Sequence, residues 1–279
     1  MKPSPPGRLR AALYDWECEQ VAHRLDQDVG FYGLLAATLG GRVLELACGT
    51  GRVSVALAER FPETRVVGLD IDGAMLLGAV ARAARSPARD RVALVRADMR
   101  RCAFAPGRFD VVTIPYNGLQ LLRDDGEAAA CLAAAAAHLR PGGALALEVT
   151  LYGEAAGIDG NPGPCRVSGE PLGAGTVAGF SVELVGGFDH DPVAGLTVYH
   201  RRWALKRRGA KPMVLEDSVG LRSLDERALD ELVSAAGLES WERERDGLSL
   251  RYTARRPADR AAGGVARGSR RPGRRLTRR

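Results

Sequence analysis

The sequence lacks several features that would indicate particular classes of protein. Its 279 residues contain no run of 18 or more apolar residues, so no segment is long enough to cross a membrane as a helix. The first twenty residues lack the apolar core of a secretory signal peptide. The five cysteines are scattered, without a C-x-x-C pair, which disfavours a disulfide framework or a zinc site. These absences predict a cytoplasmic protein without membrane or metal partners.

Most of the chain lacks an excess of positive charge, although the whole sequence carries a net charge of +6. Residues 255–279 contain ten arginines and one aspartate, a net charge of +9, so the other 254 residues carry −3. Nucleic-acid binding needs clustered positive charge on the folded surface, and such a body does not favour it. The arginine-rich tail at 255–279 is predicted to be disordered, and contact with RNA is expected only through this tail.

Apolar runs alternate with helical patterns through the first half of the chain. The expected strands end at a glycine-rich turn after Leu46, at Asp70, at Asp98, at Pro115 and near Thr150. Strands that alternate with helices form βαβ units with right-handed crossovers and a mostly parallel sheet. The predicted fold class is therefore α/β, with a doubly wound sheet.

The alternation stops after Gly153. Residues 154–175 are rich in glycine and proline and predict a loop, and residues 176–222 predict three antiparallel strands. A helix is then expected from Ser223, with Glu226 completing a capping box, followed by a hairpin that turns at Asp246-Gly247. The predicted organisation has five parts: a helical lid at 1–40, an α/β core at 41–152, an inserted antiparallel sheet at 153–222 serving as substrate cap or dimer element, a closing helix and hairpin at 223–254, and the tail.

The turn after the first expected strand reads Glu45-Leu46-Ala47-Cys48-Gly49-Thr50-Gly51. Glycines at Gly49 and Gly51 let the chain turn sharply and let a ligand approach the backbone beside a helix N-terminus. The third glycine of the dinucleotide pattern is replaced by Ser54, which disfavours a pyrophosphate ligand. Glu45 would repel a phosphate but attract an amino group. Cys48 is interpreted as a small packing residue.

Acidic residues end the second and third expected strands. Asp70 lies 21 residues after Gly49, where a carboxylate accepts the ribose hydroxyls of an adenosine ligand. Asp98 would accept from an adenine amino group, with the ring held between Ile71 and Met99. Each acid alone is as well explained as a helix cap or a solvated loop residue. Their alignment with the glycine turn favours an adenosine site, because ligands of open α/β sheets bind at the carboxyl ends of the strands.

Five motifs in order resemble those of the class I S-adenosylmethionine-dependent methyltransferases: VLELACGTGR, VVGLDID, RADM, FDVVTIPYNGLQLL and LRPGGALALEV. The resemblance spans residues 14–150. It implies a Rossmann-like sheet of seven strands, with an antiparallel strand seven between strands five and six. It also implies S-adenosylmethionine as methyl donor and S-adenosylhomocysteine as product. The residues that it places around the methionine end are Glu45, Ala47, Gly49 and Gly51; it places Asp70 at the ribose, Asp98 and Met99 at the adenine, and Pro115 and Tyr116 beside the sulfonium and the acceptor.

The inserted sheet is similar to that of small-molecule N- or O-methyltransferases. In-line transfer to an amine or hydroxyl needs positioning and removal of a proton, for which His190 and His200 are the candidate bases. Both are also explained as ordinary strand or hairpin histidines. Tyr14 is similar to the aromatic residue that some of these enzymes close over the cofactor. The alternative is that Tyr14 only packs on the surface of its helix. Tyr116 is followed by Asn117, an order that departs from the N-P-P-Y motif of base-amine methyltransferases.

The prediction is therefore a methyltransferase of a small-molecule amine or hydroxyl. Two alternatives stay open. One is an RNA or protein methyltransferase that docks through the basic tail, and the other is a non-catalytic cofactor-binding partner. A homodimer through a sheet edge of the insertion also stays open.

Overall fold

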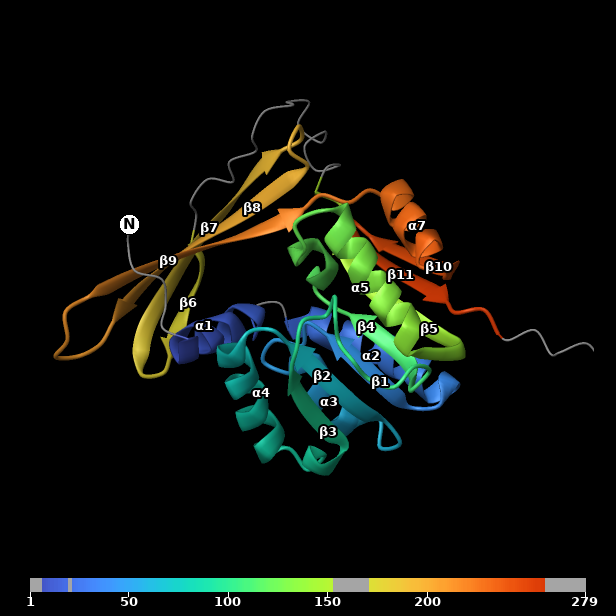
Figure 1. Cartoon of the computed structure of the whole chain (residues 1–279). Coiled ribbons are helices and arrows are strands. Elements are labelled where there is room, and N and C mark those ends of the chain that lie inside the picture. The colour runs from blue at the N-terminus through green and yellow to red at the C-terminus, as the bar shows by residue number, and fades with distance from the viewer. Residues whose placement is uncertain (1–6, 20–21, 153–170, 259–279) are drawn as a thin grey trace, which may run out of the picture.

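The computed structural model describes residues 7–19, 22–152 and 171–258, and these residues form two sheets with flanking helices (Figure 1). The larger sheet has seven strands, and the smaller one has four antiparallel strands that extend away from it. Among the described residues, no helix is both long and apolar enough to span a membrane.

The seven-stranded sheet has the order β10-β11-β5-β4-β1-β2-β3. The pairs among β1 to β5 are parallel, whereas β11 runs antiparallel between β5 and β10. This order confirms the predicted doubly wound α/β sheet and the position of strand seven between strands five and six. The strands are β1 (Arg42–Leu46), β2 (Arg65–Asp70), β3 (Val92–Arg96), β4 (Phe109–Ile114), β5 (Leu139–Thr150), β10 (Glu239–Asp246) and β11 (Ser249–Arg255).

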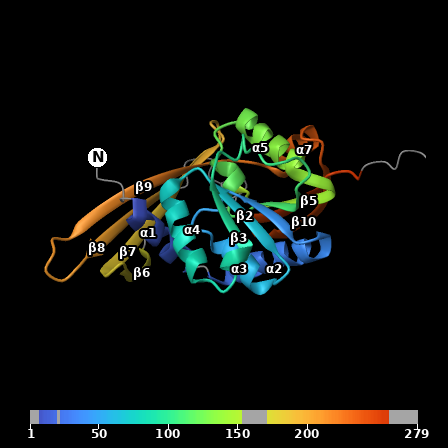
Figure 2. The same cartoon turned by 60° about the horizontal axis from the view of Figure 1, so that its bottom comes forward.

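Helices cover both faces of this sheet (Figures 1 and 2). One face packs on α5 and α7 through a cluster that includes Leu132 and Leu229. The opposite face packs on α2 and α3 through Tyr32 and Leu57. The helices are α1 (Gly7–Glu19), α2 (Ala22–Leu39), α3 (Arg52–Arg60), α4 (Gly73–Arg85), α5 (Asp125–His138) and α7 (Glu226–Ala235), with 3-10 turns η1 (Arg89–Arg91) and η2 (Gly118–Leu121).

The predicted capping box at the start of α7 is wrong. Asp225 is the N-cap, and its side chain accepts a hydrogen bond from the backbone N–H of Ala228 at 2.7 Å. A carboxylate at this position satisfies an unpaired N–H and also favours the positive end of the helix, so it displaces Ser223 as the cap. Gly237 follows the helix with a positive φ of 74°, as its C-terminal position predicts.

The smaller sheet has four described strands rather than the predicted three, in the order β6-β7-β8-β9. Residues 176–189 do not form one strand, because Ala178 and Gly179, with φ of 49° and 79°, turn the chain between β6 and β7. Residues 171–175, predicted as loop, belong to β6; the rest of that predicted loop lies outside the described residues. The strands are β6 (Pro171–Val177), β7 (Phe180–Asp191), β8 (Leu196–Lys206) and β9 (Met213–Arg222).

The end of β11 also moves one predicted boundary. Arg255 pairs with Ala144 in the sheet, and Arg256 donates from its backbone N–H to the carbonyl of Gly143. Both residues were predicted to begin the disordered tail. The ladder with β5 holds them in place, and residues 259–279 lie outside the described part of the chain.

An ion-pair cluster joins the amino ends of three strands of the large sheet. The buried carboxylate of Asp110 in β4 accepts bonds from Arg42 Nε at 2.9 Å and from Arg140 Nε at 2.7 Å. Burial raises the pKa of Asp110, but the hydrogen bonds from the two arginines outweigh burial and leave the pKa below its ordinary value.

Asp110→Asn is therefore expected to lower the free energy of unfolding by about 1–3 kcal/mol, because the buried side chain loses charge-assisted hydrogen bonds from two partly exposed arginines. A depressed folded-state pKa contributes stability that is present above the unfolded pKa and lost as the pH falls through the folded value. The difference between wild type and variant should accordingly shrink below about pH 4. Urea unfolding at pH 7 and pH 3 measures both effects, and an equal difference at both pH values would contradict the assignment.

Candidate functional site

The turn between β1 and α3 has the backbone conformation that its glycines predict. Gly49 and Gly51 have positive φ of 55° and 71°, and Ala47 shares this region at 57°. A Cβ at Gly51 would lie 3.0 Å from Cβ of Ala79 in α4, closer than side chains ordinarily approach. The backbone N–H of Cys48 donates to the carbonyl of Leu69 at 2.8 Å, which ties the turn to β2.

Glu45 lies beneath this turn rather than at its surface. It is 2% exposed and accepts a hydrogen bond from the hydroxyl of Ser54, which stands where the dinucleotide pattern has its third glycine. Burial raises the pKa of Glu45 to about 7. The Glu45 carboxylate is thus held inside the protein by Ser54, and its contact with an amino group of a ligand stays a prediction.

Asp70 ends β2 at the same edge of the sheet. Its two oxygens accept from the backbone N–H of Gly49 at 2.7 Å and of Asp72 at 2.8 Å. The cap of α4 is Asp72, so Asp70 is not a helix cap, which was its alternative explanation. The next side chain, Ile71, is 62% exposed beside it. A fixed carboxylate and an exposed apolar side chain thus lie together at the predicted ribose and adenine positions.

Asp98 has a partner that the sequence did not indicate. Arg100 donates from Nε to Oδ1 of Asp98 at 2.9 Å and also contacts Glu127 of α5. The hydrogen bonds from Arg100 lower the pKa of Asp98 to about 2. Met99 packs partly buried against the α5 side of the core. The structure places Asp98 and Met99 after β3, with the carboxylate turned toward Arg100.

Two of the predicted catalytic residues, Tyr14 and Tyr116, meet around Arg52. The guanidinium of Arg52 lies 5.5 Å from the ring centre of Tyr14 and 4.5 Å from that of Tyr116. The Tyr14 ring also lies against the turn, 3.9 Å from where a Cβ on Gly49 would stand. Tyr116 follows buried Pro115 with φ of 50°, a left-handed conformation that costs a tyrosine energy and is frequent at functional sites.

Arg52 is a buried residue beside the turn that the sequence pattern did not single out as a candidate. It is 7% exposed, and no carboxylate forms an ion pair with it in the described part of the chain. Its position was the available signal, because it is the first residue of α3 and directly follows Gly51. A buried guanidinium between two aromatic rings beside a ligand turn is suited to a carboxylate.

The two predicted bases lie on opposite faces of the smaller sheet. His190 is 6% exposed, and its Nδ1 lies 2.9 Å from the hydroxyl of Thr197. His200 is exposed, with Nε2 3.0 Å from the Asp189 carboxylate and Nδ1 2.9 Å from the hydroxyl of Ser218. Because side chains alternate along a strand, His200 lies opposite to Tyr199 and Trp203.

The face that carries Tyr199 is turned toward α1, and we call it the inner face of the cap. Trp203 packs there with Leu13 and Trp16 of α1, and the Tyr199 hydroxyl donates to Glu17 at 2.7 Å. Tyr199 stacks on Phe188 at 4.5 Å between ring centres. The sequence pattern left open which face of the insertion packs, and the contacts with α1 decide it.

No group of three or more histidine, cysteine or acidic side chains within residues 7–19, 22–152 and 171–258 is arranged to hold a metal ion. The chemistry available at this edge of the sheet comes from the turn, the strand-end carboxylates, Arg52 and the aromatic side chains. These groups suit an adenosine ligand that also carries a carboxylate.

Residues 43–143 match a family model described as a methyltransferase domain, and this segment contains the turn, Asp70, Asp98 and Tyr116. These residues form a methyltransferase domain, and the structures similar to the chain include methyltransferases solved with S-adenosylmethionine bound. The cofactor is S-adenosylmethionine, and its methionine, ribose and carboxylate groups are compatible with the turn, the Asp70 carboxylate and Arg52, which contacts two tyrosines but forms no ion pair among the described residues.

Similarity to curated methyltransferases covers only part of the chain. A trans-aconitate 2-methyltransferase from Deinococcus radiodurans is 38% identical over 108 residues, which are 39% of this chain and 37% of that protein. The first curated relatives are matched over only 37–42% of their own length. Their sequences therefore leave the cap and the acceptor unassigned.

Solved methyltransferase structures match most of the chain. An amino pentose methyltransferase from Micromonospora echinaspora, involved in calicheamicin biosynthesis, has a TM-score of 0.64 and 26% identity, covering 86% of this chain and 96% of that one. The DesVI protein of Streptomyces venezuelae has a TM-score of 0.70 and 21% identity, covering 89% and 98%. The second likeness concerns the fold alone.

Proposed function

We propose that this methyltransferase transfers a methyl group to an amino group of a small polar molecule, and that amino sugars are its acceptor class. The observation that carries the proposal is the inner face of the cap. This face carries the stacked rings of Phe188 and Tyr199 and contacts α1, the helix that also places Tyr14 against the glycine turn. The relative that acts on an amino pentose supports the acceptor class, because its likeness extends over the cap as well as the core.

The cofactor would be held along the carboxyl edge of the large sheet. The backbone of Gly49 and Gly51 would approach its methionine part, Arg52 would bind the carboxylate, and Asp70 would accept from the ribose hydroxyls. Ile71 and Met99 would flank the adenine. When bound, S-adenosylmethionine supplies a methyl group attached to a positively charged sulfur.

The remaining residues would orient the acceptor and exclude water. Tyr14 lies over the turn from α1, Tyr116 lies on the other side of Arg52, and the inner face of the cap closes the acceptor side. Positioning of this kind lowers the barrier because the acceptor is held in line with the methyl group. His200 has no part in this proposal because of its outward position, and His190 supports the inner face through Thr197.

A mass-spectrometric screen tests the proposal. Purified full-length protein with S-adenosylmethionine is offered amino sugars, simple hydroxyl sugars, small carboxylates, peptides and bulk RNA. The expected result is a product heavier by one methylene group, about 14 Da, with amino sugars and with no matched sugar that lacks the amine. Methylation of RNA, peptides or carboxylates instead would contradict the acceptor class, and cofactor binding without any turnover would favour a non-catalytic partner.

A further inference from the structure

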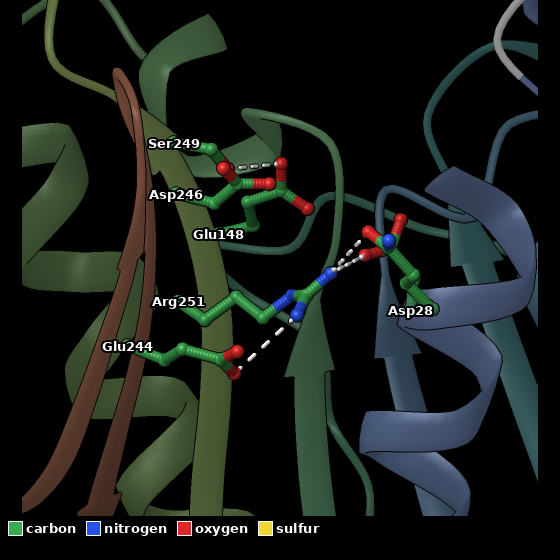
Figure 3. A pocket seen from close by; sticks show the side chains of 7 residues that line it. Asp28, Glu148, Glu244, Asp246, Ser249 and Arg251 are labelled. Carbon is green, nitrogen blue, oxygen red and sulfur yellow. Dashed lines mark hydrogen bonds and ion pairs between the residues drawn. The ribbon is translucent and has the colours of Figure 1, made fainter. Parts of the chain in front are cut away.

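An acidic pocket lies between α2 and the β10–β11 hairpin, beside the carboxyl end of β5 (Figure 3). Four of its side chains are carboxylates, and one, Arg251, is a cation. The carboxylates of Glu148 and Asp28 face one another across it (Figure 3). The lining residues are Gln27, Asp28, Glu148, Glu244, Asp246, Ser249 and Arg251.

The hydrogen bonds inside the pocket leave two oxygens unused. Arg251 donates to Oδ1 of Asp28 at 3.2 Å and lies 3.3 Å from Oε2 of Glu244. Oε1 of Glu148 accepts from the hydroxyl of Ser249 at 2.7 Å. Oδ2 of Asp28 and Oε2 of Glu148 are buried and accept no hydrogen bond of ordinary geometry from the described residues, although the Tyr116 hydroxyl lies near enough to Asp28 to lower its pKa.

Both of these side chains are deeply buried, Asp28 at 1% and Glu148 at 5% exposed. Burial, followed by the negative charge of Glu148, raises the pKa of Asp28 to about 7. A buried carboxylate without a partner is costly, and a single arginine cannot neutralise two of them. When both carboxylates are ionised, Arg251 therefore leaves one negative charge of the pair without a counter-charge.

This pocket adjoins the proposed acceptor region. The buried hydroxyl of Tyr116 lies beside Asp28, and the backbone N–H of Asn117 donates to the carbonyl of Glu148 at 3.2 Å. Tyr116 and Asn117 are both held at positive φ, so the same strained segment of chain contacts Arg52 on one side and the acidic pocket on the other.

We propose that Asp28 and Glu148 bind a primary ammonium group of the methyl acceptor, and that one of the two carboxylates accepts the proton that this nitrogen must lose before its lone pair can take the methyl group. The inference rests on the proposed function for the identity of the ligand, and on the pocket alone for its chemistry. An ammonium carries one positive charge and three N–H donors, which matches one missing charge and two unused acceptors. A divalent metal ion fits less well, because Arg251 supplies a competing positive charge and the described residues offer no metal-binding cluster.

Thermal unfolding of the full chain tests the ammonium site without any turnover. Methylammonium chloride at roughly five times its Kd should raise the Tm by about 2–4 °C, relative to tetramethylammonium or sodium chloride at the same ionic strength. Tetramethylammonium is the matched probe because it has the charge but no N–H group. The rise should be larger at pH 8.5 than at pH 6, because a proton on the pair competes with the ammonium. The other ionisable groups that face the pair are Tyr116, Tyr32, Arg251, Glu244 and Asp246.

Glu148→Gln and Asp28→Asn should each abolish the selective rise in Tm. Glu231→Gln, an exposed residue of α7 with the same change of charge, should keep it. An equal response of wild type to methylammonium and tetramethylammonium would overturn the inference, and so would a Glu148→Gln variant that responds like wild type.

Kinetics separates this inference from the proposed function. With an amine acceptor, Glu148→Gln should raise KM about 10-fold or more, the loss expected for a hydrogen bond to a charged group, and leave the Kd of S-adenosylhomocysteine unchanged. An unchanged KM would overturn the ammonium site while amine methylation by wild type still stood. If wild type methylated only compounds without an amine, the proposed acceptor class would fail, whatever the Tm measurements gave.

Discussion

Asp70→Ala is expected to weaken binding of S-adenosylhomocysteine by about 1–3 kcal/mol, roughly 5- to 150-fold in Kd. The carboxylate is the proposed acceptor for the ribose hydroxyls, and its loss would leave ligand donors unpaired in a partly buried site. It also accepts from the backbone N–H of Gly49 at 2.7 Å, so the glycine turn would lose one of its supports. Isothermal titration calorimetry measures the change.

Asp90→Ala is the matched control. It removes the same charge as Asp70→Ala, but the Asp90 side chain is 91% exposed in η1. It should leave the Kd within about twofold of wild type, as surface substitutions usually do. A small effect of Asp70→Ala, comparable to that of the control, would remove Asp70 from the cofactor site. Tighter binding of NAD than of S-adenosylhomocysteine would contradict the cofactor itself.

Trp203→Ala should lower the free energy of unfolding by about 3–5 kcal/mol, the range for truncating a buried tryptophan. Trp203 is 1% exposed and belongs to the cluster that joins the inner face of the cap to α1. Because α1 also carries Tyr14, loosening this contact should weaken cofactor binding as well, although Trp203 is not among the residues proposed to contact the cofactor. Urea unfolding and calorimetry on the same variant measure the two effects.

Trp241→Ala provides the comparison for Trp203→Ala. Trp241 is 39% exposed on β10 and stacks on Arg255 at 3.5 Å, so its truncation should cost about 1 kcal/mol or less. Trp241 lies on the edge strand of the large sheet and does not belong to the cluster that joins α1 to the cap, so its truncation should not change the affinity for the cofactor. If Trp203→Ala destabilised the chain but left the Kd of S-adenosylhomocysteine unchanged, cofactor binding would not depend on the contact between α1 and the cap.

The core of the fold followed from local patterns. Apolar periodicity predicted a strand at residues 64–70 and a helix at residues 73–85. The helix α4 has those bounds, and β2 begins one residue later, at Arg65. Glycine turns are similarly local, because a positive φ at Gly49 or Gly51 is a property of a few adjacent residues. Where two local signals competed, as at Ser223 and Asp225, the stronger acceptor at the helix start prevailed over the pattern.

Interactions between distant segments were not readable from the sequence. Arg100, the partner of Asp98, is only two residues away in sequence. The same guanidinium also donates to Glu127 of α5, and this second contact depends on how α5 packs. The two tyrosines that flank Arg52 are about a hundred residues apart, and Asp28 meets Glu148 across a similar separation. No periodicity relates such positions, because their contact depends on how helices pack on the sheet.

The sequence by itself determined the class of the fold, the order of the core elements and the residues of the cofactor turn, because each depends on short-range backbone preferences and apolar spacing. The tertiary structure alone decided which face of the cap packs on α1, which histidine lies inward, and how Arg52 and the Asp28–Glu148 pair are placed. Those features depend on burial and on charges brought together from separate elements. An alternating strand carries two faces, and only the packing of α1 on Trp203 selects the inner one.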